Sequence, residues 1–317
     1  MSDWHEAITS VPRHVLVPHF YLQDDDGTWT RADDWDTIYS DTTLVTTFDG
    51  PQAVSSSTAP SIMIRMLDAL HLHNGHRVLE IGTGTGYNAG LLSHRLGSDH
   101  VFSVDLDETL VDRARERLAS IGYTPTLVAR DGEKGLPEHA PYDRIIATCA
   151  VPEIPRAWLE QTTEGGLILA DYKPSGDAGN LVLLERRGDV AKGRFLPEWA
   201  GFMPMRHHNT TTPPHPVRDR TNARTRATTA PQPPWDHPVP WFLARMPPNL
   251  TYGHGPDYVF LATGSEWCEV REGMVTEHGA LWTRFEAAYE QWRTDGEPSW
   301  SRFGLTVSPG GHEVWMR

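Results

Sequence analysis

The segment from residue 78 to residue 88 has the residue types of a ligand-binding loop, because a short apolar run leads directly into closely spaced glycines. These are Gly82, Gly84 and Gly86, at the entry to a predicted helix. Glycine permits a tight turn and lets a ligand approach the backbone, while a helix N-terminus presents free N–H groups. Dinucleotide-dependent enzymes carry Gly-x-Gly-x-x-Gly at this place, but the spacing differs here. Glu80, just before the loop, favours a ligand with an ammonium or sulfonium group.

Two acidic residues further along the chain belong to the same predicted site. Asp105 ends the second predicted strand, where its carboxylate can accept hydrogen bonds from both hydroxyls of a ribose. Asp131-Gly132 follows the third strand, where an adenine would lie. Each has a simpler role open to it, helix capping for Asp105 and turn formation for Asp131-Gly132. Their joint placement after consecutive strands favours a single binding cleft.

Alternating strands and helices are expected to position these residues. Short apolar runs alternate with helical patterns from Arg77 to about Glu185, which is typical of a parallel α/β sheet. Apolar residues at helical spacing predict helices over residues 59–72 and 108–121. The predicted strands cover residues 77–81, 101–105, 124–129, 142–147 and 167–171.

A change of composition after Met203 divides the chain into three predicted parts. Residues 1–203 hold the α/β domain with the glycine loop. Residues 204–240 are rich in Pro, Thr and Arg, so we expect a linker or a loop draped over that domain. Residues 241–317 carry a second ordered region, a C-terminal extension of α+β character.

The extension is predicted to contain a strand, a helix and a closing hairpin. Residues 257–263 have the pattern of a strand, and residues 281–292 place apolar side chains on one face of a helix. The runs 303–307 and 312–316 predict a hairpin joined through Pro309-Gly310-Gly311. Four tryptophans are candidate anchors for a partner, although we expect at least half of them to fill the core: Trp241, Trp267, Trp282 and Trp292.

Charge and composition exclude several classes of protein. The net charge of −14 gives no long-range attraction to nucleic acid or anionic lipid, so we expect neither as a partner. The chain has no long apolar stretch and no signal-peptide pattern, which predicts a cytoplasmic protein without a membrane span. Cys149 and Cys268 are the only cysteines, and their distant positions predict inert thiols rather than a disulfide or a thiolate metal site.

Two polar clusters fall in or near the predicted linker. The one basic run of this acidic chain is either a solvated loop or a binding element for an acidic peptide, and it comprises Arg218, Arg220, Arg224 and Arg226. The histidines that lie nearest together are His207, His208 and His215. Since no carboxylate is regularly spaced among them, we predict no metal site.

Several blocks, taken together, resemble the protein-L-isoaspartate O-methyltransferase family over about residues 8–190. The run from Val78 through the glycine loop to Tyr87 is similar to that family's S-adenosylmethionine motif. Residues 11–18 resemble its N-terminal signature, which includes His14, a residue for packing or for substrate contact. The other matching blocks are Tyr39-Ser40-Asp41, Asp131-Gly132, residues 141–146 and Glu164-Gly165-Gly166.

The resemblance implies a Rossmann-like fold, S-adenosylmethionine as cofactor, and carboxyl methylation of aspartyl or isoaspartyl side chains in a peptide or protein. A carboxylate with an ordinary pKa of about 4 is already ionised at neutral pH, so this reaction needs no general base. Catalysis should then come from orienting the carboxylate. The cofactor residues implied are Glu80, Gly82, Thr83, Gly84, Gly86, Tyr87, Asp105, Leu106, Asp131 and Gly132.

One motif departs from the family pattern. The family's Gln-Thr-Ile-Ser, whose hydroxyls sit where methyl transfer occurs, is replaced by a Ser-rich run. Counting back from the glycine loop places Thr58 on the family's Ser and Ser56 on its Thr, whereas counting forward would choose Ser55. We assign Thr58 and Ser56 to the substrate, with Ser57 in reserve. The alternative is that these hydroxyls cap the following helix.

The length of the chain suggests a more specific role. The region beyond residue 203 exceeds the family's usual compact domain, and long versions resemble actinobacterial methyltransferases encoded with ribosomally made peptides such as graspetides. That resemblance implies tailoring, in which a methylated Asp collapses to a succinimide (aspartimide). General isoaspartate repair and a non-catalytic peptide-binding module remain alternatives. A nicotinamide oxidoreductase would need a different glycine spacing and a proton donor that does not stand out.

Overall fold

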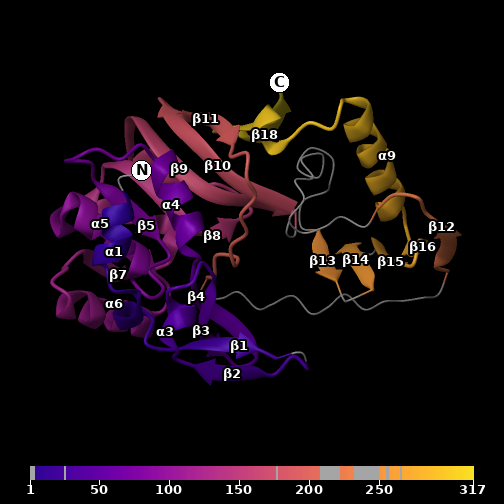
Figure 1. The fold of residues 1–317 in the computed structure, drawn as a ribbon. Helices are drawn as coiled ribbons and strands as arrows, with labels where there is room; N and C mark the ends of the chain where they lie inside the picture. The colour runs from indigo at the N-terminus through magenta and orange to yellow at the C-terminus, as the bar shows by residue number, and fades with distance from the viewer. Residues whose placement is uncertain are drawn as a thin grey trace.

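A mixed sheet forms the centre of the fold (Figure 1). The computed structural model describes residues 4–24, 26–175, 178–207, 222–231, 250–254, 257–264 and 266–317. The parallel part of the sheet comprises β5 (Val78–Ile81), β6 (Val101–Asp105), β7 (Thr126–Ala129), β8 (Tyr142–Val151) and β9 (Thr162–Ser175). Antiparallel strands extend it: β10 (Ala178–Arg187), β11 (Val190–Phe195), β17 (Phe303–Ser308) and β18 (Gly311–Met316). The spatial order is β18-β17-β11-β10-β9-β8-β5-β6-β7.

Two apolar cores cover the two faces of this sheet. Side chains alternate along each strand, so Val78 and Val101 enter one core while their neighbours Leu79 and Phe102 enter the other. The first core is completed by α1 (Trp4–Ser10), α4 (Pro60–Ala69), α5 (Tyr87–Leu96) and α6 (Glu108–Ser120). The second contains Trp158 of α7 (Arg156–Gln161). Burial on both faces is why these strands are continuously apolar in the sequence. Short 3-10 helices are η1 (Ser98–His100), η2 (Gly132–Lys134), η3 (Pro137–His139) and η4 (Trp300–Arg302).

The N-terminal part of the chain also forms an antiparallel four-stranded sheet, which lies below the central mixed sheet in Figure 1. Its order is β2-β1-β3-β4, and its elements, with the two short helices between them, are α2 (Arg13–Leu16), β1 (Phe20–Gln23), β2 (Trp29–Ala32), α3 (Trp35–Ile38), β3 (Leu44–Asp49) and β4 (Gln52–Ser57). The buried guanidinium of Arg13 holds this region together, because it donates to the carbonyls of Ile38, Ser40, Thr42, Ser57 and Thr58.

The extension has a small core of its own. A five-stranded antiparallel sheet of order β12-β16-β15-β14-β13 comprises β12 (Arg224–Ala227), β13 (Thr251–His254), β14 (Tyr258–Thr263), β15 (Glu266–Arg271) and β16 (Met274–His278). Helix α9 (Leu281–Thr294) packs on it. Trp267, Trp282 and Trp292 are buried, so they fill cores rather than anchor a partner, and Trp241 lies outside the described residues. No helix in the described part of the chain is long and apolar enough to cross a membrane.

The predicted strands and helices are confirmed within a few residues, and β9 is much longer than expected. The predicted hairpin is also confirmed, but its strand β17 pairs with β11, so the hairpin extends the central mixed sheet. Phe303, Leu305 and Val307 are buried there against the second core. Residues 224–227, expected to be linker, instead form the edge strand β12 beside β16. Most of the rest of the predicted linker, residues 208–221 and 232–240, lies outside the described residues.

Candidate active site

The glycine loop after β5 adopts backbone conformations that require glycine at two places. Gly82 has φ +101°, and a Cβ there would lie 2.6 Å from the hydroxyl of Thr148. Gly86 has φ +84° at the start of α5, where a Cβ would lie 3.1 Å from Ala114 of α6. The loop therefore packs closely on the end of β8 and on α6, and a side chain at either position would displace it.

Glu80 is connected to the glycine loop by hydrogen bonds. Its buried carboxylate accepts hydrogen bonds from the Asn88 amide at 2.8 Å and from the Ser103 hydroxyl at 2.5 Å. The Ser103 hydroxyl also lies 2.6 Å from that of Thr83. Burial raises the pKa of Glu80 to about 7, although both hydrogen bonds favour the charged form, and nearby Asp105 adds to the rise.

Replacing Glu80 with glutamine should make the protein less sensitive to pH. Between pH 4.5, the ordinary pKa, and about pH 7, the folded protein holds a proton that the unfolded chain has released. The free energy of unfolding therefore falls as the pH rises through this window, by about 3 kcal/mol in total. Glu80→Gln, which mimics the protonated form, should raise the melting temperature at pH 8 and change it much less at pH 5. Exposed Glu6→Gln is the control, and an equal effect of Glu80→Gln at both pH values would refute the assignment.

A cavity opens at the carboxyl ends of β5, β6 and β8, and we call it the strand-end cavity. The carboxylate of Asp105 is in its wall, where it accepts the N–H of Gly84 at 2.9 Å and that of Asp107 at 3.2 Å. Burial raises the pKa of Asp105, while those two bonds oppose the rise. Each oxygen keeps a further acceptor position, so hydroxyl groups of a ligand can bind this carboxylate.

The strand-end cavity collects about half of the predicted residues. Those in its wall are Ser56, Gly82, Gly84, Asp105, Leu106 and Gly132. The predicted residues that do not line it, all within the described part of the chain, are Ser57, Thr58, Glu80, Thr83, Gly86, Tyr87 and Asp131. Among them Tyr87 is buried, with the Arg13 guanidinium 5.5 Å from its ring centre.

Thr148 and Cys149 line the cavity although the sequence did not single them out as site residues. They directly follow the predicted fourth strand, so the strand-end rule that indicated Asp105 would have found them. The Thr148 hydroxyl donates to the carbonyl of Gly82 at 2.8 Å. Burial, with nearby carboxylates, raises the pKa of the Cys149 thiol, and the pKa of the Cys268 thiol is also raised. Both cysteines are free, and the prediction of inert thiols agrees with these environments.

The segment Met203–Arg206 forms another wall of the cavity, and no sequence motif indicated it. Met203 and Met205 bond through their backbones to Ala150 of β8, each at 2.8 Å. The preceding residue, Phe202, donates its N–H to Asp171 at 2.9 Å, and its carbonyl accepts from Lys173 at 3.3 Å. Asp171 and Lys173 form a buried ion pair, 3.3 Å apart. This pair therefore fixes the segment across the strand ends.

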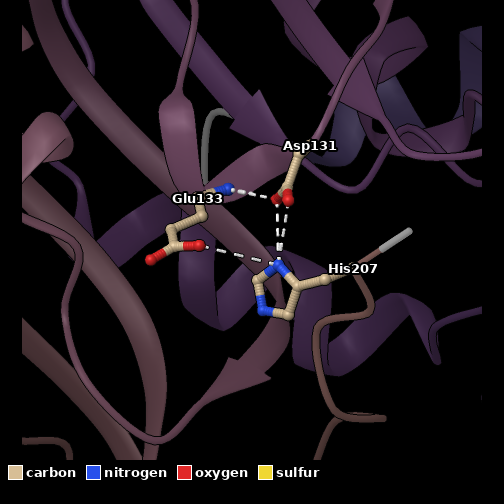
Figure 2. Close-up of side chains that lie close together, drawn as sticks. All are labelled: Asp131, Glu133 and His207. Atoms are coloured by element: carbon tan, nitrogen blue, oxygen red, sulfur yellow. Dashed lines mark hydrogen bonds and ion pairs between the residues drawn. The ribbon is translucent and has the colours of Figure 1, made fainter. Parts of the chain in front are cut away.

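Asp131, the residue predicted to bind adenine, is hydrogen-bonded to His207, which directly follows the segment Met203–Arg206 (Figure 2). The Asp131 carboxylate lies 3.0 Å from Nδ1 of His207 and accepts the N–H of Glu133 at 3.0 Å. Partial burial alone would raise the pKa of Asp131, but the bonds from His207 and Glu133 outweigh it and lower the pKa. A ligand amine that binds Asp131 must therefore share this carboxylate with His207.

Asp131, Glu133 and His207 also bear on the reasoning by which the sequence predicted no metal site. The sequence placed no carboxylate near the histidines, yet Asp131 and Glu133 from the turn after β7 each present an oxygen to His207, all within 4.8 Å. Asp131 and His207 are partly buried and Glu133 is exposed, and the hydrogen bond between His207 and Asp131 accounts for the cluster. His208 and His215 lie outside the described residues.

The Ser-rich run does not cap the following helix. Ala59 occupies the N-cap of α4 without a side-chain bond, and Asp41 accepts the N–H of Ser61 instead. The hydroxyl of Ser57 is buried and 3.3 Å from a guanidinium nitrogen of Arg13. Ser56 lines the strand-end cavity and, like Thr58, is partly exposed. The capping alternative is thus wrong for this helix.

Ser55 and His14 have partners within the N-terminal region. The Ser55 hydroxyl accepts from Thr46 at 3.3 Å and is buried beside Gly84. Nδ1 of His14 lies 2.6 Å from the Tyr39 hydroxyl, and its ring stacks on Trp35 with centroids 4.2 Å apart. The His14 ring is therefore held by packing against α3 and Tyr39 while remaining partly exposed.

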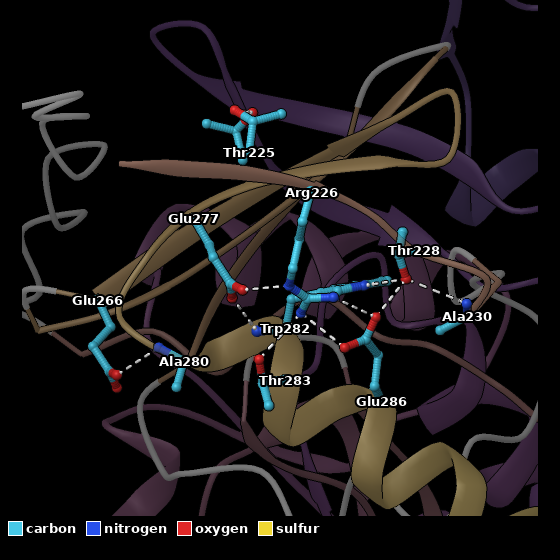
Figure 3. Close-up of polar contacts among 11 residues, drawn as sticks. Thr225, Arg226, Thr228, Ala230, Glu266, Glu277, Ala280, Trp282, Thr283 and Glu286 are labelled. Atoms are coloured by element: carbon cyan, nitrogen blue, oxygen red, sulfur yellow. Dashed lines mark hydrogen bonds and ion pairs between the residues drawn. The ribbon is translucent and has the colours of Figure 1, made fainter. Parts of the chain in front are cut away.

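The predicted basic run is partly neutralised by the extension itself (Figure 3). Arg226 on β12 pairs with Glu277 at 3.1 Å and with Glu286 of α9 at 2.8 Å. The pair with Glu286 joins the edge strand to the helix, and the pair with Glu277 joins it to β16, so the charge of Arg226 is compensated within the chain. This corrects the expectation that it contributes to binding an acidic peptide. Arg218 and Arg220 lie outside the described residues.

Comparisons with known proteins agree with this geometry. The family model "Protein-L-isoaspartate(D-aspartate) O-methyltransferase (PCMT)" matches residues 5–197. A protein-L-isoaspartate O-methyltransferase of Ignicoccus hospitalis is 36% identical over 204 residues, 63% of this chain and 87% of its own length. One of Methanosarcina mazei is 36% identical over 195 residues, 58% of this chain and 73% of its own.

A solved structure extends the likeness of fold to the extension. A protein-L-isoaspartate O-methyltransferase with 22% identity superposes with a TM-score of 0.61, covering 99% of this chain and 94% of its own. The strand-end cavity also suits S-adenosylmethionine, because Asp105 offers an acceptor for ribose hydroxyls beside glycines that leave the backbone accessible. The family model spans more than half of the chain, so this protein belongs to the protein-L-isoaspartate O-methyltransferase family and is an S-adenosylmethionine-dependent methyltransferase.

Proposed function

We propose that this protein methylates the side-chain carboxylate of an aspartyl or isoaspartyl residue in a peptide, and that the ester collapses to a succinimide during tailoring of a ribosomally made peptide. The observation that carries the carboxyl methylation is the arrangement of the Ser-rich run. Ser56 faces the strand-end cavity, Thr58 is partly exposed two residues on, and the structure uses neither hydroxyl to cap α4. Ser57 is engaged by Arg13 and serves the fold.

The chemistry requires orientation rather than proton transfer. When bound, S-adenosylmethionine supplies the methyl group and leaves as the neutral thioether S-adenosylhomocysteine. A substrate carboxylate oxygen forms the new O–CH₃ bond, and the substrate needs no base because it is already ionised. The hydroxyls of Ser56 and Thr58 donate to that carboxylate and hold it in line. In the later step the next backbone nitrogen attacks the ester carbonyl, loses its proton, and methanol leaves.

The cofactor would be held by the strand ends. Asp105 would accept hydrogen bonds from the ribose hydroxyls, and Asp131 would accept one from the adenine amine. Gly82 and Gly84 would let the cofactor approach the backbone. Glu80 lies beneath the loop and would act by positioning Thr83 through Ser103. Met203–Arg206 would cover the bound cofactor from the opposite side.

The extension bears on both tailoring and general repair. A domain that accepts any damaged protein gains nothing from a large added surface, whereas a dedicated peptide gains affinity and orientation from it. The full-length likeness to a solved protein-L-isoaspartate O-methyltransferase favours repair as the second candidate, because a similar extension occurs in a protein of that name. The extension alone therefore does not decide between the two.

Incubation with S-adenosylmethionine and three substrates tests the proposal: an isoaspartyl hexapeptide, its aspartyl counterpart, and a cyclised precursor encoded beside the gene. Mass spectrometry should show addition of a methyl group to the precursor, then loss of methanol. Asp105→Ala should weaken calorimetric binding of S-adenosylhomocysteine by about 1 to 3 kcal/mol, because bonds to a charged acceptor are lost. Exposed Asp112→Ala is the control. Efficient methylation of the isoaspartyl hexapeptide alone would establish repair, and cofactor binding without any methyl ester would leave a peptide-binding module.

A further inference from the structure

A second cavity adjoins the strand-end cavity and has a different character. We call it the arginine cavity, and its wall includes His19, Thr46, Thr47, Gly84, Arg113 and Arg117. Gly84 lines both cavities. The Thr46 hydroxyl, in the wall of the arginine cavity, donates to the Ser55 hydroxyl beside the strand-end cavity at 3.3 Å. The two cavities are therefore separated by only a loop and a pair of side chains.

Positive charge gathers around the arginine cavity although the chain carries a net charge of −14. Arg113 and Arg117 lie one helical turn apart on α6, and Arg31 comes from β2, where it pairs in register with Tyr21 of β1. His19 lines the cavity together with Arg113 and Arg117. Burial lowers the pKa of His19, and the positive charges of Arg31, Arg117 and Arg113 lower it further. Burial lowers the pKa of Arg117 too, and Arg113 adds to that effect.

These charges are poorly compensated within the protein. Within the residues that the structure describes, Arg31 and Arg113 make no ion pair, and Arg117 donates to the Leu16 carbonyl at 3.0 Å. The acidic groups that act on this region are Asp33, toward His19, and Glu116, toward Arg117. By contrast, Arg226 in the extension has two glutamate partners. Like charges held together without counter-charges destabilise a fold, so such a cluster points to an anionic ligand.

We propose that the arginine cavity binds a carboxylate side chain of the peptide substrate, next to the residue that is methylated. This inference rests on the proposed function, and it names the class of substrate: an acidic peptide segment. Successive side chains of an extended peptide point to opposite faces, with a rise of about 3.3 Å per residue. A peptide that crosses the Gly84 loop with its reacting carboxylate toward Ser56 can therefore direct an adjacent side chain to the other side of that loop, toward the arginine cavity. Arginine is well suited to the role, because its fork of N–H groups matches the geometry of a carboxylate.

Because the protein is negatively charged overall, an acidic peptide can be attracted to the arginine cavity only at short range. The protein as a whole repels an acidic peptide, so affinity has to come from groups that contact it at short range. Exposed Arg113 and partly buried Arg117 line the cavity, and exposed Arg31 of β2 adds positive charge near His19. A carboxylate held among them would be selected over the neutral amide of the same shape.

Binding of two matched peptides to protein saturated with S-adenosylhomocysteine tests this proposal. Each is an isoaspartyl hexapeptide with blocked termini, and the pair differs only in having Glu or Gln on both sides of the isoaspartyl residue. Calorimetry at low salt should show about tenfold tighter binding of the Glu peptide to the wild type. Arg113→Glu should abolish that preference, and Arg31→Glu, on another element, should do the same. Arg293→Glu makes the same charge change on exposed α9 and should leave the preference intact.

The outcomes distinguish this inference from its rivals. An unchanged preference for the Glu peptide in both Arg113→Glu and Arg31→Glu would overturn it. Weaker binding of S-adenosylhomocysteine by these variants, without a change in peptide preference, would show that the cavity takes the carboxylate of the cofactor instead. If the preference is lost in both variants but no peptide is ever methylated, the docking site stands and the proposed methylation fails. Melting curves of the variants confirm that each one is folded.

Discussion

Replacing Thr58 with alanine is expected to lower the rate of methyl transfer about a hundredfold while cofactor affinity changes little. The Thr58 hydroxyl is proposed to hold the substrate carboxylate in line, and a displacement of the reacting atoms by about 1 Å is enough for a loss of this size. The loss should appear mainly in kcat, because the interaction strengthens in the transition state. Initial rates with saturating peptide, together with calorimetry of S-adenosylhomocysteine, measure the two quantities.

Two serines serve as comparisons for this variant. Ser61→Ala removes an exposed hydroxyl near the start of α4, and its rate should match the wild type. Ser57→Ala removes the hydroxyl that contacts Arg13, so its main effect should be a loss of stability of about 1 kcal/mol. A Thr58→Ala protein with a near-normal rate, or one whose rate falls only as far as its stability does, would contradict the assigned role.

Replacing Asp171 with alanine is expected to lower the free energy of unfolding by about 3 to 5 kcal/mol, because the buried ammonium of Lys173 then loses the carboxylate that lies 3.3 Å away. The change also removes the acceptor for the N–H of Phe202. The segment Met203–Arg206 should then lose its anchor across the strand ends, so binding of S-adenosylhomocysteine should weaken as well. Melting curves and calorimetry on the same protein measure both effects.

A double variant separates charge from packing. Asp171→Ala combined with Lys173→Met removes both charges, so a large part of the lost stability should return. Cofactor affinity should stay low in the double variant, because the bonds to Phe202 are still missing. Asp189→Ala breaks an exposed ion pair with Arg156 and should change stability by less than about 1 kcal/mol. Equal losses from the buried and the exposed pair would refute the role given to Asp171.

Much of the central mixed sheet could be predicted, because the patterns that form its strands and helices depend on residues close together in the chain. Apolar strands buried on both faces, helical spacing of Leu110, Ala114 and Leu118, and glycines before α5 depend on residues close together in the chain. The order of polar residues at successive strand ends placed Gly82, Asp105 and Gly132 in one cavity. The edge strand β12 was missed because backbone pairing with β16 and ion pairs with β16 and α9, rather than apolar residues, hold it in place.

The role of each hydroxyl in the Ser-rich run was decided by the fold. Four hydroxyl residues follow one another from Ser55 to Thr58. The sequence alone therefore allows either the first and third or the second and fourth of them to face the substrate. Arg13, more than forty residues earlier, engages Ser57, and Thr46 engages Ser55. These contacts leave Ser56 and Thr58 as the two residues of the run whose hydroxyls make no hydrogen bond among the described residues, while the Thr58 carbonyl accepts from Arg13.

The sequence by itself determined the glycine loop and the strand ends, because backbone conformation at Gly82 and Gly86 and the alternation of buried side chains depend on neighbouring residues. Only the tertiary structure decided what surrounds them. Met203–Arg206 reaches the cavity through the buried pair of Asp171 and Lys173, and the arginine cavity unites β3 with α6. Such contacts join residues far apart in the chain, and their electrostatic energy depends on distance and burial, which no local pattern encodes.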